Sequence, residues 1–174
     1  MNAPLKNIER FEAIEAALFL GREFILWLWW ATTVDAPLPD GIVVELCGAL
    51  TLERVGAEVE RTAMRGVAPS SQAEAMDALR DGKMPTSARL YVTQNEKHWS
   101  FVLHADRLVL TGLKVPALLT DKEDDGLAER LQLTRDIEGH VDALFAAFVR
   151  LRTSDDWPAV ATTMRAWVRG AVAS

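Results

Sequence analysis

The sequence predicts an α+β fold, in which an antiparallel meander sheet of about five to six strands is packed by a long N-terminal helix and two C-terminal helices. Two patterns lead to this prediction. Hydrophobic residues recur every three or four positions near both ends of the chain, and at every second position between them. Because 49% of the 174 residues are hydrophobic, we expect one domain over residues 1–174.

The N-terminal helix is predicted from about residue 7, where apolar positions begin to recur at intervals of three or four. Its second half, Phe24–Trp30, is apolar almost all round, but Arg22 and Glu23 leave it shorter than a membrane span. Such a helix must be covered on all sides. Either the C-terminal helices complete the cover, or a homodimer or partner interface forms through Trp27, Trp29 and Trp30.

Three short strands are predicted over residues 42–64, where apolar and polar residues alternate. Gly48 and Gly56 separate these strands. In the third strand we place Val59 and Ala63 on the apolar face.

A β-hairpin is predicted over residues 88–104, with its turn at Asn95 and Glu96. This turn pairs Leu90 with Phe101 and Val92 with Trp99, so that the apolar faces of the two strands coincide. Two shorter elements flank the hairpin. A helix capped by Ser71 and Glu74 ends near Gly82, and a strand runs from Arg107 to Leu110.

Two helices close the chain. An acidic loop over residues 121–125 leads into the first, where acidic side chains favour the positive end of the helix dipole. Ser154 is the expected N-cap of the second helix. The buried stripe of the first comprises Leu127, Leu131, Thr134, Ile137, Val141, Leu144, Phe145 and Phe148.

Catalysis, metals and cofactors are not expected. The chain has no glycine-rich phosphate loop, nucleophile elbow or pair of cysteines, and Cys47 reads as a small buried residue. His98 and His104 are about 20 Å apart along a strand, too far to share one ion. We interpret His140 as a residue at the edge of the helix. We interpret the acidic loop as a solvated loop rather than a magnesium site.

Charge is unevenly distributed along this chain of net charge −6. Residues 80–114 carry six bases and three acids, whereas residues 121–138 carry seven acids and three bases. The basic segment is a candidate site for DNA phosphates. The alternative is an ordinary hydrated sheet face, because polar residues must occupy the outer face of the hairpin in any case. The candidate DNA-binding residues are Arg80, Lys83, Arg89, Tyr91, Lys97 and Lys114. A second basic cluster comprises Arg150, Arg152, Arg165 and Arg169.

Residues 19–30, with the sequence FLGREFILWLWW, resemble a segment of the bacterial recombination-associated RdgC family. Shorter stretches at residues 78–83, 88–90, 99–101, 113–116 and 164–167 resemble the same family. The resemblance implies a non-catalytic, ring-forming dimer that binds duplex DNA without sequence preference and restrains the recombinase RecA. The chain is too short for every part of that ring, so it resembles a short, divergent member or a domain.

We therefore expect a DNA-associated protein linked to recombination control. The alternative is an acidic protein-interaction module that uses the Trp-rich helix and does not bind DNA. Such a module would bind a second copy of the chain or another protein. We expect no contact with a membrane in either case. Charged residues among the first twenty break the apolar run of a secretory signal, so we expect a cytoplasmic location, on the nucleoid if DNA is bound.

Overall fold

The computed structural model describes residues 20–54, 61–66, 73–120 and 123–170. A helix covers residues 20–33, and a short 3₁₀ turn, Pro39–Gly41, leads into the sheet. The elements that follow are β1 (Val43–Glu53), β2 (Arg61–Gly66), α2 (Ala73–Arg80), β3 (Met84–Gln94), β4 (Lys97–His104), β5 (Val109–Lys114), α3 (Glu123–Arg152) and α4 (Trp157–Val168). The predicted α+β class is confirmed, as are the two C-terminal helices and the N-terminal helix from residue 20 onward; its predicted first part, residues 7–19, lies outside the described residues.

The five strands form one antiparallel sheet in the order β2-β1-β3-β4-β5. Only β3, β4 and β5 follow one another as in a meander, because β1 lies between β2 and β3. The first two predicted strands are one: β1 continues through Gly48, where a bulge with φ of 88° shifts the register. The buried side of β2 is also opposite to the prediction, since Met64 is buried and Ala63 is exposed.

The predicted hairpin is confirmed residue by residue. β3 and β4 pair Leu90 with Phe101 and Val92 with Trp99. The turn residues Asn95 and Glu96 have φ of 49° and 63°, the left-handed values of a two-residue turn that matches the twist of the strands.

Two predicted boundaries are wrong, and a third lies outside the described residues. The last strand is Val109–Lys114 rather than Arg107–Leu110. The cap predicted for α2 at Ser71 lies outside the described residues, and α2 is described from Ala73. Ser154 does not cap α4: its hydroxyl donates to the carbonyl of Leu151 at 2.8 Å and so serves the end of α3.

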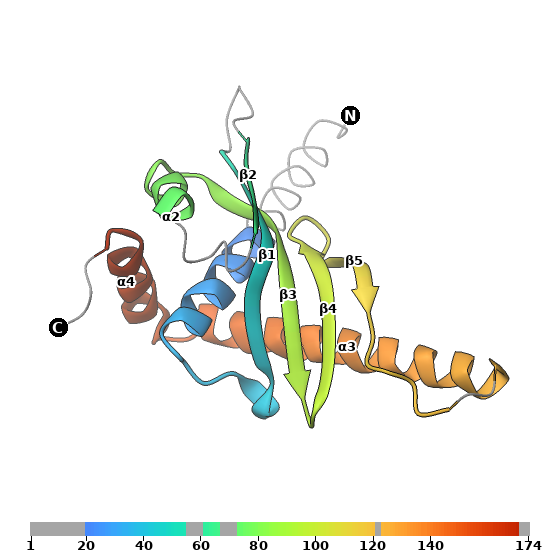
Figure 1. Ribbon diagram of the computed structural model, residues 1–174. Coiled ribbons are helices and arrows are strands. Elements are labelled where there is room, and N and C mark those ends of the chain that lie inside the picture. The colour runs from blue at the N-terminus through green and yellow to red at the C-terminus, as the bar shows by residue number, and fades with distance from the viewer. Residues whose placement is uncertain (1–19, 55–60, 67–72, 121–122, 171–174) are drawn as a thin grey trace, which may run out of the picture.

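The N-terminal helix and α3 pack on one face of the sheet, and no described helix covers the other face (Figure 1). Alternate strand residues point into this single core, so β3 contributes Ala88, Leu90 and Val92 while β4 contributes Trp99, Phe101 and Leu103. None of the helices in the described part of the chain combines the length and the apolar content that crossing a membrane requires.

Trp27 and Trp29 pack inside the chain, contrary to an interface role. Trp29 is fully buried and meets Trp167 edge to face, with ring centroids 5.3 Å apart. Trp27 is buried against Phe148, with centroids 5.6 Å apart. The C-terminal helices therefore cover the part of this helix that the sheet leaves open. Of its three tryptophans, only Trp30 stays half-buried.

The first half of α3 projects past β5 (Figure 1). Leu127 and Leu131 are 61% and 52% exposed, so their predicted place on the buried stripe is wrong. Apart from Gly126 near its start, burial on α3 begins at Leu133 and continues through Ile137, Val141, Leu144 and Phe148.

Candidate nucleic-acid interface

The helix-free face of the sheet carries the polar side chains of the hairpin. Arg89, Tyr91 and Thr93 alternate with the buried residues of β3, and the register sets Tyr91 opposite Ser100 and Ser100 opposite Lys114. Since directly paired residues share a face, Lys114 lies on the same side as Tyr91. Tyr91 is 43% exposed on the middle strand, where its ring is open to a stacking partner.

The bulge in β1 makes room for Arg89. A Cβ added to Gly48 would lie 2.9 Å from Cδ of Arg89, so the aliphatic part of Arg89 lies across β1 at the one residue without a side chain. Arg65 joins the same face, because it pairs with Ala49 next to the bulge. Arg65 is absent from the predicted set because that set was taken from the basic segment, residues 80–114. The buried Met64 shows that its neighbour Arg65 points to the opposite, helix-free face.

Opposite charges lie on the two sides of the sheet. Among the described strand residues, Arg65, Arg89 and Lys114 share the helix-free face with one carboxylate, Glu45, while Glu53 and Arg61 offset each other at 3.7 Å near the end of β1. The helix side presents the first part of α3, in which residues 123–142 carry seven acids and two arginines. An anionic partner is therefore attracted to the helix-free face and repelled by the exposed side of α3.

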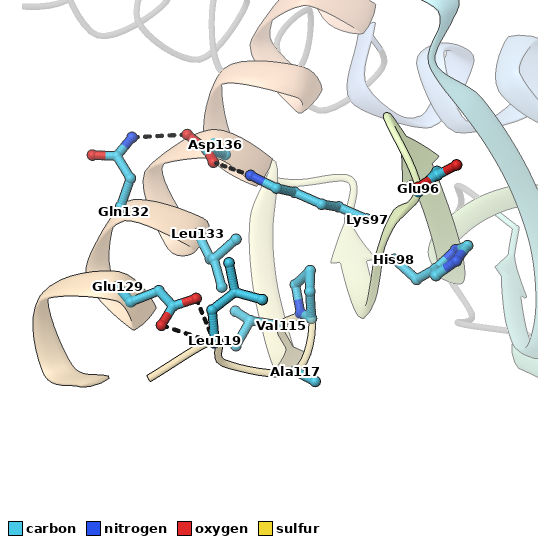
Figure 2. A pocket seen from close by; sticks show the side chains of 11 residues that line it. Glu96, Lys97, His98, Val115, Ala117, Leu119, Glu129, Gln132, Leu133 and Asp136 are labelled. Atoms are coloured by element: carbon cyan, nitrogen blue, oxygen red, sulfur yellow. Dashed lines mark hydrogen bonds and ion pairs between the residues drawn. The ribbon is translucent and has the colours of Figure 1, made fainter. Parts of the chain in front are cut away.

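The other three candidate residues lie elsewhere. Lys97 reaches from the hairpin toward α3, where its Nζ is 3.9 Å from Oδ2 of Asp136 (Figure 2). Arg80 and Lys83 lie at the corner between α2 and the start of β3. The structure thus brings together Arg89, Tyr91 and Lys114, and separates them from Arg80, Lys83 and Lys97.

A cleft of about 760 Å³ lies between the hairpin, residues 115–119 and α3 (Figure 2). Two of the three carboxylates that line it are engaged: Glu129 accepts hydrogen bonds from the backbone N–H of Leu119 at 2.8 and 3.0 Å, and Asp136 accepts one from Gln132 at 2.8 Å. The ring of His98 points away from α3 (Figure 2). The wall formed by residues 115–119 and Leu133 is apolar, and the polar side chains of Lys97, Glu129 and Asp136 at its rim are held by other groups of the chain, which suits a binding surface.

The histidines of the hairpin bond to threonines on the helix-free face. A ring nitrogen of His98 is 2.9 Å from the hydroxyl of Thr93, and one of His104 is 2.9 Å from that of Thr111. Within the described ranges, no three His, Cys, Asp or Glu side chains converge as a metal ligand set would.

Two other titratable groups are shifted by their surroundings. Burial against Trp99, whose ring centroid is 5.3 Å away, lowers the pKa of His140, although Asp136 and Asp40 raise it. Burial and Glu45 raise the pKa of the Cys47 thiol, and Arg89 opposes them. Cys47 is half-buried rather than buried, with a cation near it that the sequence did not reveal, but it stays a protonated thiol at neutral pH.

Comparison of the chain with protein-family models, with curated proteins and with solved structures finds no match. The resemblance to the RdgC family stays a prediction, and the structure is interpreted from its own chemistry.

Proposed function

We propose that this protein is a non-catalytic DNA-binding protein that contacts duplex DNA, without sequence preference, through the helix-free face of its sheet. The observation that carries the proposal is the separation of charge across the sheet: Arg65, Arg89 and Lys114 on one side, and the acidic half of α3 on the other. Cations that contact phosphates supply affinity without reading bases, which fits a face with few groups suited to base recognition.

The test is binding of a fluorescently labelled duplex, followed by anisotropy at increasing salt. Arg89→Glu combined with Arg65→Glu should reduce affinity by at least tenfold, because two attractive contacts become repulsive. Arg135→Glu is the matched control: it makes the same change at an exposed position on α3, outside the pocket that Lys114 shares with Arg130, and should have little effect. Lys97→Glu should also have a smaller effect than Arg89→Glu, since Lys97 faces Asp136.

Two outcomes would contradict the proposal. One is the absence of any duplex binding at low salt. The other is equal loss of affinity in Arg135→Glu and Arg89→Glu, which would indicate that net charge rather than the helix-free face governs binding.

The resemblance to RdgC extends this proposal to the control of recombination, with the protein on the nucleoid. Occupied duplex would then be a poorer substrate for a recombinase. Strand exchange should be inhibited by the unmodified protein and not by the Arg65→Glu, Arg89→Glu variant, and equal inhibition by both would overturn the link.

A second candidate is a protein-interaction module, favoured by apolar residues on two flanks of the projecting half of α3. Leu127 and Leu131 are exposed on one flank, and Leu119, 96% exposed, lies at the cleft. In this candidate function the interaction surface is the first half of α3, and not the Trp-rich helix that the sequence suggested. Light scattering tests the homodimer form: a dimer that dissociates when Leu127 and Leu131 become lysine supports it, and a monomer at every concentration contradicts it.

A further inference from the structure

We propose that the corner between α2 and α4 is a binding site for a phosphate monoester that carries a compact apolar group. Figure 1 shows α2 and α4 on the side of the molecule away from the projecting end of α3. A pocket of about 290 Å³ lies between them and the start of β3. This site is separate from the proposed DNA-binding face and does not depend on it.

Among the described residues, four cations from three segments of the chain line this pocket, and no carboxylate does. They are Arg80 at the end of α2, Lys83 before β3, and Arg165 and Arg169 near the end of α4. Bases are common near helix C-termini, where they complement the last carbonyls. Arg80 has that role, since its Nε donates to the carbonyl oxygen of Val168 at 2.9 Å, but one such contact does not account for four cations.

Two of the cations are held in place, and two have donors available. Nη1 of Arg80 bonds to Oδ1 of Asp77 at 2.7 Å, and Nζ of Lys83 donates to the hydroxyl of Thr62 at 2.9 Å. The guanidinium of Arg165 reaches only the hydroxyl of Thr162, at 3.4 Å. Arg169 makes no side-chain hydrogen bond or ion pair within the part of the chain that the structure describes.

The chemistry of the pocket selects the ligand. A guanidinium offers a planar fork of donors that matches the oxygens of phosphate, and a dianion relieves the repulsion among four cations better than a monoanion does. Leu26, Met84 and Val168 provide an apolar wall, and they also line an adjoining space of about 130 Å³ beside Trp157. These volumes admit a phosphate with a ring or a short alkyl group, and they exclude a stacked base pair.

Phenyl phosphate is the probe, with inorganic phosphate beside it, titrated into the full chain by calorimetry. Phenyl phosphate should bind about tenfold more tightly than inorganic phosphate, because its ring is removed from water. Arg165→Ala with Arg169→Ala should reduce its affinity at least tenfold; both residues are exposed, so the fold should persist, as circular dichroism can verify. Arg150→Ala, an exposed arginine of α3 outside the pocket, is the matched control and should bind normally.

Met84→Ser separates the two parts of the site. It should weaken the binding of phenyl phosphate and leave that of inorganic phosphate unchanged.

The proposal is overturned if phenyl phosphate does not bind, or if it binds the Arg165→Ala, Arg169→Ala variant as tightly as the unmodified chain. It is also overturned if that variant loses affinity for duplex DNA alone, since the corner would then contact the DNA backbone. Arg89→Glu should leave phenyl phosphate binding unchanged, so failure of the DNA proposal is distinguishable from failure of this one.

Discussion

Gly48 determines the geometry of the proposed DNA-binding face at the scale of one residue. Its φ of 88° is in the left-handed region, and an added Cβ would lie 2.9 Å from Arg89. Gly48→Ala should therefore reduce the free energy of unfolding by about 1–2 kcal/mol, through backbone strain and displacement of Arg89. Urea unfolding measures this, and duplex affinity should fall in parallel.

Gly139→Ala is the control for Gly48→Ala. Gly139 lies inside α3 with nothing within 4 Å of an added Cβ. The substitution should raise the free energy of unfolding by up to about 1 kcal/mol, because alanine favours a helix interior. Equal destabilisation by both alanines would contradict the role given to Gly48.

The lowered pKa of His140 leads us to expect that the protein loses stability in mild acid. Its folded pKa lies below the ordinary 6.5 because burial disfavours the charged ring, so the unfolded chain binds the proton more tightly. The stability due to the neutral ring is complete above pH 6.5 and is lost as the pH falls through the folded pKa. Urea midpoints measured over this window should fall less in His140→Phe, which keeps an aromatic edge against Trp99.

His98→Gln is the control for His140→Phe, since His98 is exposed. It should leave the pH dependence as it is in the unmodified protein. If His140→Phe also leaves the dependence unchanged, other groups cause it.

Individual contacts were predictable from the sequence where they are local. The Leu90–Phe101 pair follows from a two-residue turn and a period of two. The proximity of Arg89 to Cys47 was not predictable, because it depends on a bulge and on pairing between distant strands.

At the scale of elements, α3 is longer than the layer it covers. Its 30 residues extend about 45 Å at 1.5 Å per residue, whereas five strands about 4.8 Å apart span roughly 20 Å. Because α3 runs across the strands, its first half has no sheet beneath it (Figure 1). Periodicity identifies an apolar stripe, but the width of the opposing layer decides how much of that stripe is buried.

The exposed leucines of α3 should tolerate polar substitution. Leu127→Gln and Leu131→Gln should each change the free energy of unfolding by within about 0.5 kcal/mol. Leu144→Ala, by contrast, should cost about 2–5 kcal/mol, since Leu144 is buried. Chemical denaturation at low protein concentration measures both, and a cost at Leu127 equal to that at Leu144 would show that the first half of α3 is covered.

At the scale of the whole molecule, the net charge of −6 hides two sides of opposite character. Salt should act on DNA binding through the few cations of the helix-free face. With Arg65, Arg89 and Lys114 each on one phosphate, log Kobs against log salt should have a slope of about −3, at about −0.9 per neutralised phosphate. Lys114→Ala should make that slope shallower by about 1, and an unchanged slope would remove Lys114 from the interface.

The order of the strands in the sheet could not be predicted from the sequence. Alternation reports that a strand exists and which of its sides is buried, but it does not identify the neighbouring strand. The meander expectation is therefore right for β3 to β5, which short turns connect, and wrong for β1, which pairs with β3 across the intervening β2 and α2. The separation of Arg80 and Lys83 from Arg89 follows from the same three-dimensional arrangement.

The strand order has a consequence for how the chain folds. β3 and β4 meet across a two-residue turn, whereas β1 reaches β3 only by pairing Val43 with Thr93 and Glu53 with Met84. Closing that long loop costs more entropy than closing the hairpin, so we expect the hairpin to form early and the docking of β1 to limit the folding rate. Until β1 arrives, the backbone edge of β3 is open to any other strand, and crowded refolding should favour aggregation at this edge over every other part of the sheet.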